Sequence, residues 1–136
     1  MKFEFLEHTA DVKFRAYGKT LEEVFENSVL AMIKSICEDK VKKKKEIKIK
    51  IKGKDLEGLL YNFLEELIFL FDSEGFLVAG LKEMKIDLER KELNCILLGD
   101  KAESYEIFSH VKAITYNEMF VKKVNNKYVV QVVLDI

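Results

Sequence analysis

The stretch DLEGLLYNFLEELIFLFDSEG, residues 55–75, decides the fold class, because it is strongly helical and only strand patterns follow it. Asp55 is a suitable N-cap, and Gly75 suits the end of a helix. Apolar residues recur at three- and four-residue steps, which predicts an amphipathic helix: Leu56, Leu59, Leu60, Phe63, Leu64, Leu67, Ile68 and Phe71. Three further apolar residues lie off this stripe: Tyr61, Phe69 and Leu70. The helix is therefore either buried on several sides or carries a partner surface.

A second helix is predicted upstream, over residues 20–37, where Thr20 and Glu23 have capping-box spacing. The other segments alternate with period two and are predicted strands: 2–8, 11–17, 46–53, 81–90, 92–99, 110–115, 118–124 and 127–136. Turn residues separate them: Gly18, Gly53, Arg90-Lys91 and Asn125-Asn126. Long runs of strands predict an α+β fold, an antiparallel or mixed sheet with two amphipathic helices on one side. Because the chain has no proline and no Gly/Ser linker, we expect one domain, residues 1–136.

Composition narrows the function only slightly. The formal net charge is −1, so overall charge indicates neither a nucleic-acid nor a membrane partner. The longest apolar run, residues 59–71, is too short and too charged to span a bilayer. Cys37 and Cys95 lie in no metal or redox motif, and we expect two buried thiols in a reducing cytoplasm.

The segment KVKKKKEIKIKIKGK, residues 40–54, holds nine lysines. Its isoleucines alternate with lysines, as in a half-buried strand at a charged sheet edge. The same lysines are also compatible with phosphate contacts, and a stand-alone RNA-binding module is the alternative function. No aromatic residues interleave with them to stack bases.

Catalytic motifs are not found: the sequence has no phosphate-binding glycine loop, nucleophile elbow or HExxH motif. His8, Thr9 and Asp11 lie almost side by side along an extended segment, where successive side chains point in alternating directions. They cannot easily converge on one substrate, so we do not expect an enzyme. His110, with no neighbouring metal ligand, is expected to be a surface or hydrogen-bonded residue.

Carboxylates at the two ends of the chain are the remaining candidates. Asp11 shares a strand face with polar residues, and Asp135 precedes Ile136, whose α-carboxylate adds a second negative charge. If Asp11 met them, repulsion would be about 4 kcal/mol per pair at 4 Å and an effective dielectric of 20. A cation would offset it, and oxygen ligands suit calcium or magnesium. The alternative is two ordinary surface aspartates.

Three stretches together carry a resemblance to a known family: EHTADVKFRAYGKTLEEVFENSVLAM at the N-terminus, LEGLLYNFLEELIFLFDSEG in the middle, and VKAITYNEMFVKKVNNKYVVQVVLDI at the C-terminus. They resemble the archease family, whose members are partners of the RtcB-type tRNA-splicing RNA ligase. The resemblance implies a non-enzymatic activator that promotes guanylylation of the ligase by GTP before RNA joining, and that broadens nucleotide use in some members.

The resemblance also implies a metal site, usually calcium, formed by Asp11, Asp135 and Ile136. His8 and Lys112 are implied contacts to the ligase or its nucleotide. Two features depart from the family pattern: Asn117 stands where histidine is usual, and the segment GDKAESYEIFSH, residues 99–110, is short. Roles that depend on that histidine or loop are not carried over.

Overall fold

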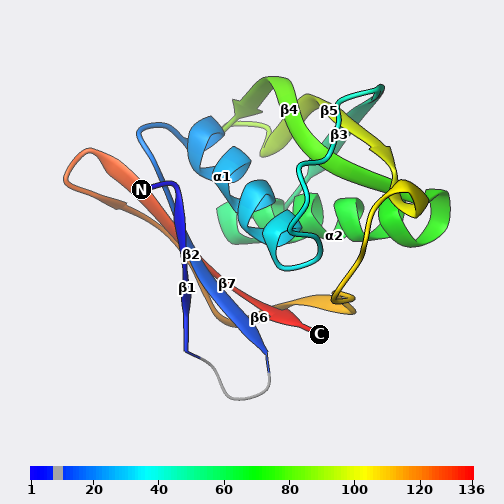
Figure 1. Ribbon diagram of the computed structural model, residues 1–136. Helices are drawn as coiled ribbons and strands as arrows, with labels where there is room; N and C mark the ends of the chain where they lie inside the picture. The colour runs from blue at the N-terminus through cyan, green and yellow to red at the C-terminus, as the bar shows by residue number, and fades with distance from the viewer. Residues whose placement is uncertain (8–10) are drawn as a thin grey trace.

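The computed structural model describes residues 1–7 and 11–136 (Figure 1). The helices and strands follow one another in this order: β1 (Phe3–Leu6), β2 (Val12–Gly18), α1 (Leu21–Lys34), β3 (Lys45–Lys52), α2 (Leu56–Glu74), β4 (Phe76–Asp87), β5 (Glu92–Lys101), a 3-10 turn η1 (Ala102–Ser104), β6 (Ala113–Val124) and β7 (Lys127–Asp135). The predicted α+β class is confirmed.

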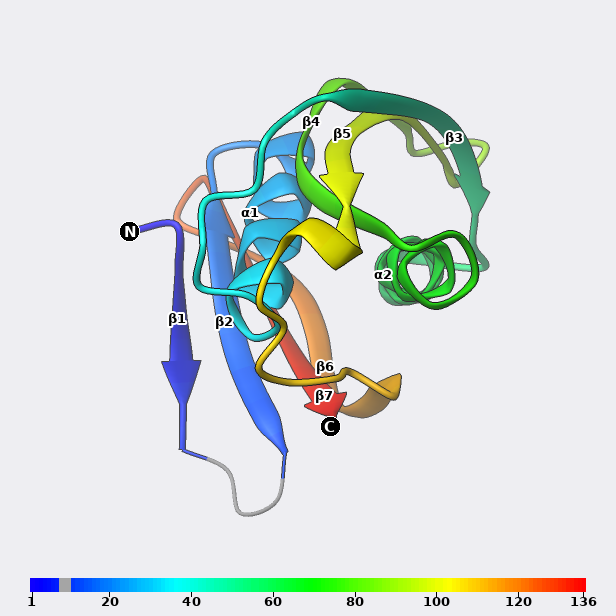
Figure 2. The ribbon, with the colours of Figure 1, turned by 45° about the vertical axis from the view of Figure 1, so that its right-hand side comes forward.

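The strands form two antiparallel sheets rather than the single sheet expected. One has the order β1-β2-β7-β6 and the other the order β3-β5-β4. Each helix contacts strands of both sheets, so the helices lie between the sheets instead of covering one side (Figures 1 and 2). Helical periodicity shows that a helix has an apolar face, but it does not show how many sheets pack against it.

Both helices begin at their predicted caps and α2 ends as predicted, whereas α1 ends at Lys34 rather than near residue 37. The Thr20 hydroxyl accepts a hydrogen bond from the Glu23 N–H, and the Asp55 carboxylate accepts one from the Gly58 N–H. Gly75 ends α2 in the left-handed conformation, with φ of 63°.

The off-stripe residues of α2 have different environments. Leu70 is buried, Tyr61 is half-buried, and Phe69 is 56% exposed. The position of α2 between two sheets therefore explains why Leu70 is buried, but it does not explain the exposed Phe69.

Two strand predictions were wrong in extent. β4 begins at Phe76, directly after α2, whereas period-two alternation becomes visible only from Leu81. The first part of β4 is buried without alternation, and its register shifts between Val78 and Gly80. The two strands expected over residues 110–124 are a single strand, β6, whose register shifts between Thr115 and Phe120. A bulge breaks the sequence pattern without ending the strand.

The core lies between the sheets and holds both cysteines as free, buried thiols. Burial raises the pKa of the Cys95 thiol to about 12, so this thiol is not a nucleophile at neutral pH. No helix in residues 1–7 and 11–136 is long and apolar enough to cross a membrane.

Candidate metal centre

Antiparallel pairing of β2 with β7 brings the two candidate aspartates to the same end of one sheet. The register pairs Val12 with Leu134. Asp11 directly precedes β2, and Asp135 is the last residue of β7. Because the two strands are antiparallel, both aspartates lie at the same end of the pair. Both ribbon views show the C-terminal end beside the start of β2 (Figures 1 and 2). The sequence alone did not predict this juxtaposition.

Asp135 is also held from its other side. It pairs with Ala113 of β6, and the Lys112 N–H donates a hydrogen bond to the Asp135 carbonyl oxygen over 2.7 Å. The exposed Lys112 side chain therefore starts from backbone that adjoins Asp135. His8 lies outside the described residues.

The donor chemistry of this sheet end fits a hard cation. Asp11 is half-buried, whereas Asp135 and Ile136 are exposed, and each offers oxygen atoms only. In the described part of the chain, no group of three or more His, Cys, Asp and Glu side chains is placed to hold a metal ion. Calcium takes six to eight oxygen ligands. The two aspartates and the Ile136 oxygens are thus a partial set that needs oxygens from water or from a partner.

Next to these aspartates, a hydrogen-bonded network holds the β6 bulge on the outer face of the four-stranded sheet. The buried Gln131 side chain donates to the Glu118 carbonyl over 2.7 Å and accepts from Arg15 Nε over 2.9 Å. Lys13 Nζ lies 3.1 Å from the Glu118 carboxylate. The network fixes Glu118 at a positive φ of 57°. Sequence reasoning missed it, although a lone glutamine within the apolar run VVQVV is an available signal.

The bulge places Tyr116 and Asn117 in solvent beside α2. The Tyr116 ring stacks on Tyr61, with ring centroids 4.2 Å apart and an interplanar angle of 2°. Desolvation raises the pKa of the Tyr61 phenol, and Glu65 adds to the increase. The stretch VKAITY, residues 111–116, is therefore divided: Val111 and Ile114 are buried, whereas Tyr116 and the departure from the family pattern at Asn117 lie on the exposed bulge.

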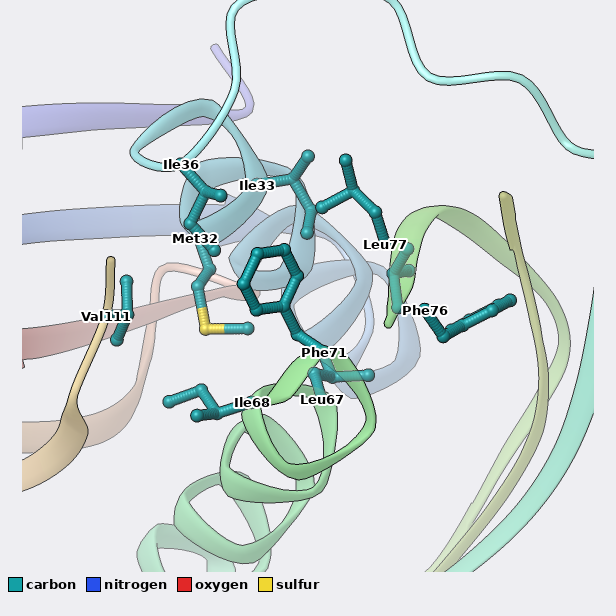
Figure 3. A pocket seen from close by; sticks show the side chains of 10 residues that line it. Met32, Ile33, Ile36, Leu67, Ile68, Phe71, Phe76, Leu77 and Val111 are labelled. Carbon is teal, nitrogen blue, oxygen red and sulfur yellow. The ribbon is translucent and has the colours of Figure 1, made fainter. Parts of the chain in front are cut away.

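The described chain has a small cavity in the core, but its lining does not suit a cofactor. It lies between α1, α2, the start of β4 and Val111, as Figure 3 shows. Its volume is about 10 Å³, roughly room for one water, and the lining side chains are apolar. The cavity is a packing gap rather than a ligand site.

The candidate His110 is exposed and lies at the side of α2. Its Nε2 is 2.9 Å from the Asp72 carboxylate, and its ring lies 6.4 Å from the Phe71 ring. The predicted hydrogen-bonded surface role of His110 is confirmed.

Comparison with known proteins identifies the family. The model of the Archease protein family (MTH1598/TM1083) matches residues 3–136. The chain belongs to the archease family.

Archeases from distant organisms match over nearly their whole length. The protein archease of Pyrococcus furiosus is 43% identical over 99% of both chains. That of Methanosarcina mazei is 39% identical over 99% of this chain and 96% of the relative. The archease-like protein of Drosophila melanogaster is 41% identical over 100% of this chain and 91% of the relative.

Solved structures agree with the archease fold. The solution structure of Methanobacterium thermoautotrophicum protein 1598 has a TM-score of 0.83 and 35% identity, with 99% of both chains covered. The crystal structure of an archease from Thermotoga maritima, described as a possible chaperone, has a TM-score of 0.66 at 20% identity, covering 96% of this chain and 94% of that one. The second likeness concerns the fold alone.

Proposed function

We propose that this archease is a non-enzymatic activator of an RtcB-type tRNA-splicing RNA ligase. In this role it promotes guanylylation of the ligase by GTP, so that the ligase completes many rounds of RNA joining. Family membership over residues 3–136 supports the proposal, and favours it over a stand-alone RNA-binding module. The observation that carries it is the meeting of Asp11 and Asp135 at one exposed end of the β2–β7 pair.

The arrangement suits an activator that works through a partner. Asp11, Asp135 and the Ile136 oxygens would hold a calcium ion, which supplies concentrated positive charge toward the partner. Because these residues provide only part of a calcium shell, oxygens from the ligase or its nucleotide would complete it. Lys112 and His8 are proposed contacts to the same partner, since Lys112 adjoins Asp135.

The proposal requires no turnover by the chain itself. Free, buried Cys37 and Cys95 are compatible with a reducing compartment, and we place the activity in the cytoplasm.

A guanylylation assay tests the proposal. Purified ligase, GTP and a divalent metal are incubated with and without the protein, and covalent GMP on the ligase is measured. We expect faster guanylylation with the protein, and a loss of at least roughly tenfold in that stimulation for Asp11→Asn and for Asp135→Asn, the scale of about 1.4 kcal/mol. Glu106→Gln, which changes one exposed carboxylate elsewhere, is the matched control and should stimulate fully.

Two results would contradict the proposal. One is full stimulation by either aspartate variant that remains folded. The other is GTP or RNA turnover by the isolated protein, which would make it an enzyme in its own right.

A further inference from the structure

The outer face of the three-stranded sheet carries lysines on both edge strands. Residues that pair directly across antiparallel strands project to the same face. The register of β3 and β4 against β5 defines two successive rows: Lys48, Ile96 and Lys82 in one, and Lys50, Asn94 and Lys85 in the next. All four lysines are exposed, so each row ends in an ammonium group on both sides.

Regular strand geometry sets the spacing of the rows on β3 and across the sheet. Neighbouring strands lie about 4.8 Å apart, and alternate residues of one strand about 7 Å apart. The four lysine backbones therefore mark the corners of an area roughly 10 Å across the sheet and about 7 Å along β3, whereas on β4 a bulge that contains Glu83 separates Lys82 from Lys85. Between them, the floor consists of the half-buried Ile96 and the exposed Asn94. We call these six residues the lysine face.

More positive charge borders the lysine face. The Lys43 side chain crosses above Gly80 of β4, with its Cε 3.2 Å from the position that a Cβ on Gly80 would take. Lys52 follows Lys50 along β3 and lies 3.3 Å from the Glu92 carboxylate. Glu92 also lies 3.8 Å from Lys50, so one carboxylate is shared by two ammonium groups.

The positive charges of this surface are incompletely neutralised. Glu46 pairs with Lys82 over 3.1 Å, whereas Lys48 and Lys85 make no ion pair with any residue that the structure describes. Counting Lys43 and Lys52, six lysines lie on or beside the lysine face, and in the described structure three of them pair with only two carboxylates, Glu46 and Glu92. The whole chain carries a formal charge of −1, so positive charge is concentrated here.

Protection of the sheet edges does not explain this pattern fully. A charge of either sign blunts an edge strand, and alternating signs would avoid repulsion between neighbours. The lysine face instead has one sign at all four corners. A polyanion laid across the sheet removes the repulsion and meets several charges at once.

We infer that the lysine face binds the phosphate backbone of RNA. Lysine supplies compact point charges, and no arginine or aromatic side chain is present on this face to read or stack bases, so binding would be independent of sequence. The choice of RNA among polyanions rests on the proposed function, because the ligase joins RNA. The three-stranded sheet lies away from the C-terminal end of β7 in both ribbon views, which leaves the carboxylate end free for the ligase (Figures 1 and 2).

Binding of a fluorescent single-stranded RNA by the isolated protein tests the inference. Anisotropy is measured from about 50 to 200 mM salt, the range over which phosphate contacts weaken strongly. The variant Lys48→Gln/Lys50→Gln/Lys82→Gln/Lys85→Gln should lose at least tenfold in affinity. Its slope of log affinity against log salt should fall by as much as about 3, since each lost single-strand phosphate contact contributes about 0.7.

The matched control removes four exposed lysines elsewhere: Lys2, Lys19, Lys34 and Lys127, each replaced by Gln. It changes the net charge equally and should keep most of the affinity. If the fourfold variant fails to fold, the double variant Lys48→Gln/Lys85→Gln replaces it, because these two lysines have no ion pair in the described structure. Its slope of log affinity against log salt should fall by roughly 1.4, about half of the change expected for the fourfold variant.

Four outcomes would overturn the inference: no binding of RNA by the unchanged protein at low salt, equal binding by the fourfold variant, equal loss in the control, or tighter binding to anionic vesicles or poly-glutamate than to RNA. Guanylylation of the ligase without RNA separates this result from the proposed function. The fourfold variant should stimulate it fully, so loss of RNA binding and loss of activation are scored independently.

Discussion

Gln131 holds the β6 bulge by donating a hydrogen bond from Nε2 to the main-chain oxygen of Glu118 over 2.7 Å. The same side chain accepts a bond from Arg15 Nε on the neighbouring strand β2. A single buried amide thus joins the three strands that surround the carboxylate end of the sheet. Its geometry determines where Tyr116 and Asn117 lie.

Gln131→Ala should lower the free energy of unfolding by about 1–3 kcal/mol, because two hydrogen bonds of a buried amide, to the Glu118 carbonyl and from Arg15, are lost. Chemical denaturation measures the change. Asn94→Ala, at an exposed position of central strand β5, is the matched control and should change stability by no more than about 0.5 kcal/mol. Equal losses in the two variants would show that the amide does not stabilise the bulge.

Calcium should raise the melting temperature if Asp11 and Asp135 hold it. Free calcium at a hundred times its Kd adds about 2.7 kcal/mol to stability, which corresponds to roughly 5–10 °C for a chain of this size. Asp11→Asn and Asp135→Asn should each abolish the shift, whereas Glu106→Gln should keep it. An unchanged shift in both aspartate variants would place the ion elsewhere.

Acid stability should depend on Tyr105. Its hydroxyl donates to the Asp100 carboxylate over 2.7 Å, and this bond, followed by the Lys101 N–H, lowers the pKa of Asp100 below its ordinary value of 3.8. A lowered folded-state pKa adds stability that is complete well above pH 3.8 and is lost as pH falls through the lower folded value.

Tyr105→Phe should therefore reduce stability at neutral pH and flatten its decline below about pH 4. Urea unfolding at a series of pH values measures this. Tyr128→Phe, which removes a hydroxyl from the half-buried Tyr128 of β7, is the control and should keep the unmodified pH dependence. The same steep decline in Tyr105→Phe would rule out the bond as its cause.

Alanine should be far more destabilising at Gly99 than at Gly80. A Cβ at Gly99 would lie 2.2 Å from the Leu77 carbonyl oxygen in the paired strand, so the backbone must move. A Cβ at Gly80 meets only the flexible end of Lys43. Thermal unfolding should show a loss of about 3 kcal/mol or more for Gly99→Ala, and a change within about 0.5 kcal/mol for Gly80→Ala. Similar melting of both variants would argue against the close approach of β4 and β5.

Local features of the fold were predictable because their causes are local. Thr20, Asp55 and Gly75 mark helix ends through bonds and backbone angles within a few residues. The turn at Asn125 and Asn126 has positive φ at both positions, as asparagines permit. Such signals do not depend on the rest of the chain.

Pairing between distant strands was not predictable in the same way. How the strands divide into two sheets depends on which strands pair edge to edge. The alternation of apolar and polar residues shows only which face of a strand is buried. The same limit applies to the candidate site. Asp11 and Asp135 were recognisable as candidates, yet only the β2–β7 register places them at one sheet end. In the same way, the sequence does not show that the lysines of β4 and those of β3 share one face of a sheet. Only the pairing of both strands with β5 shows it.

The β2–β7 pairing also has a consequence for biosynthesis. β7 must leave the ribosome before Asp135 can reach Asp11, because β2 is among the first of the described strands to be made and β7 follows all the others. A nascent chain that still lacks β7 therefore has Asp11, both helices and the β1–β2 pair, but not the strand that carries Asp135. The centre would thus distinguish molecules in which β7 has paired from chains in which it has not.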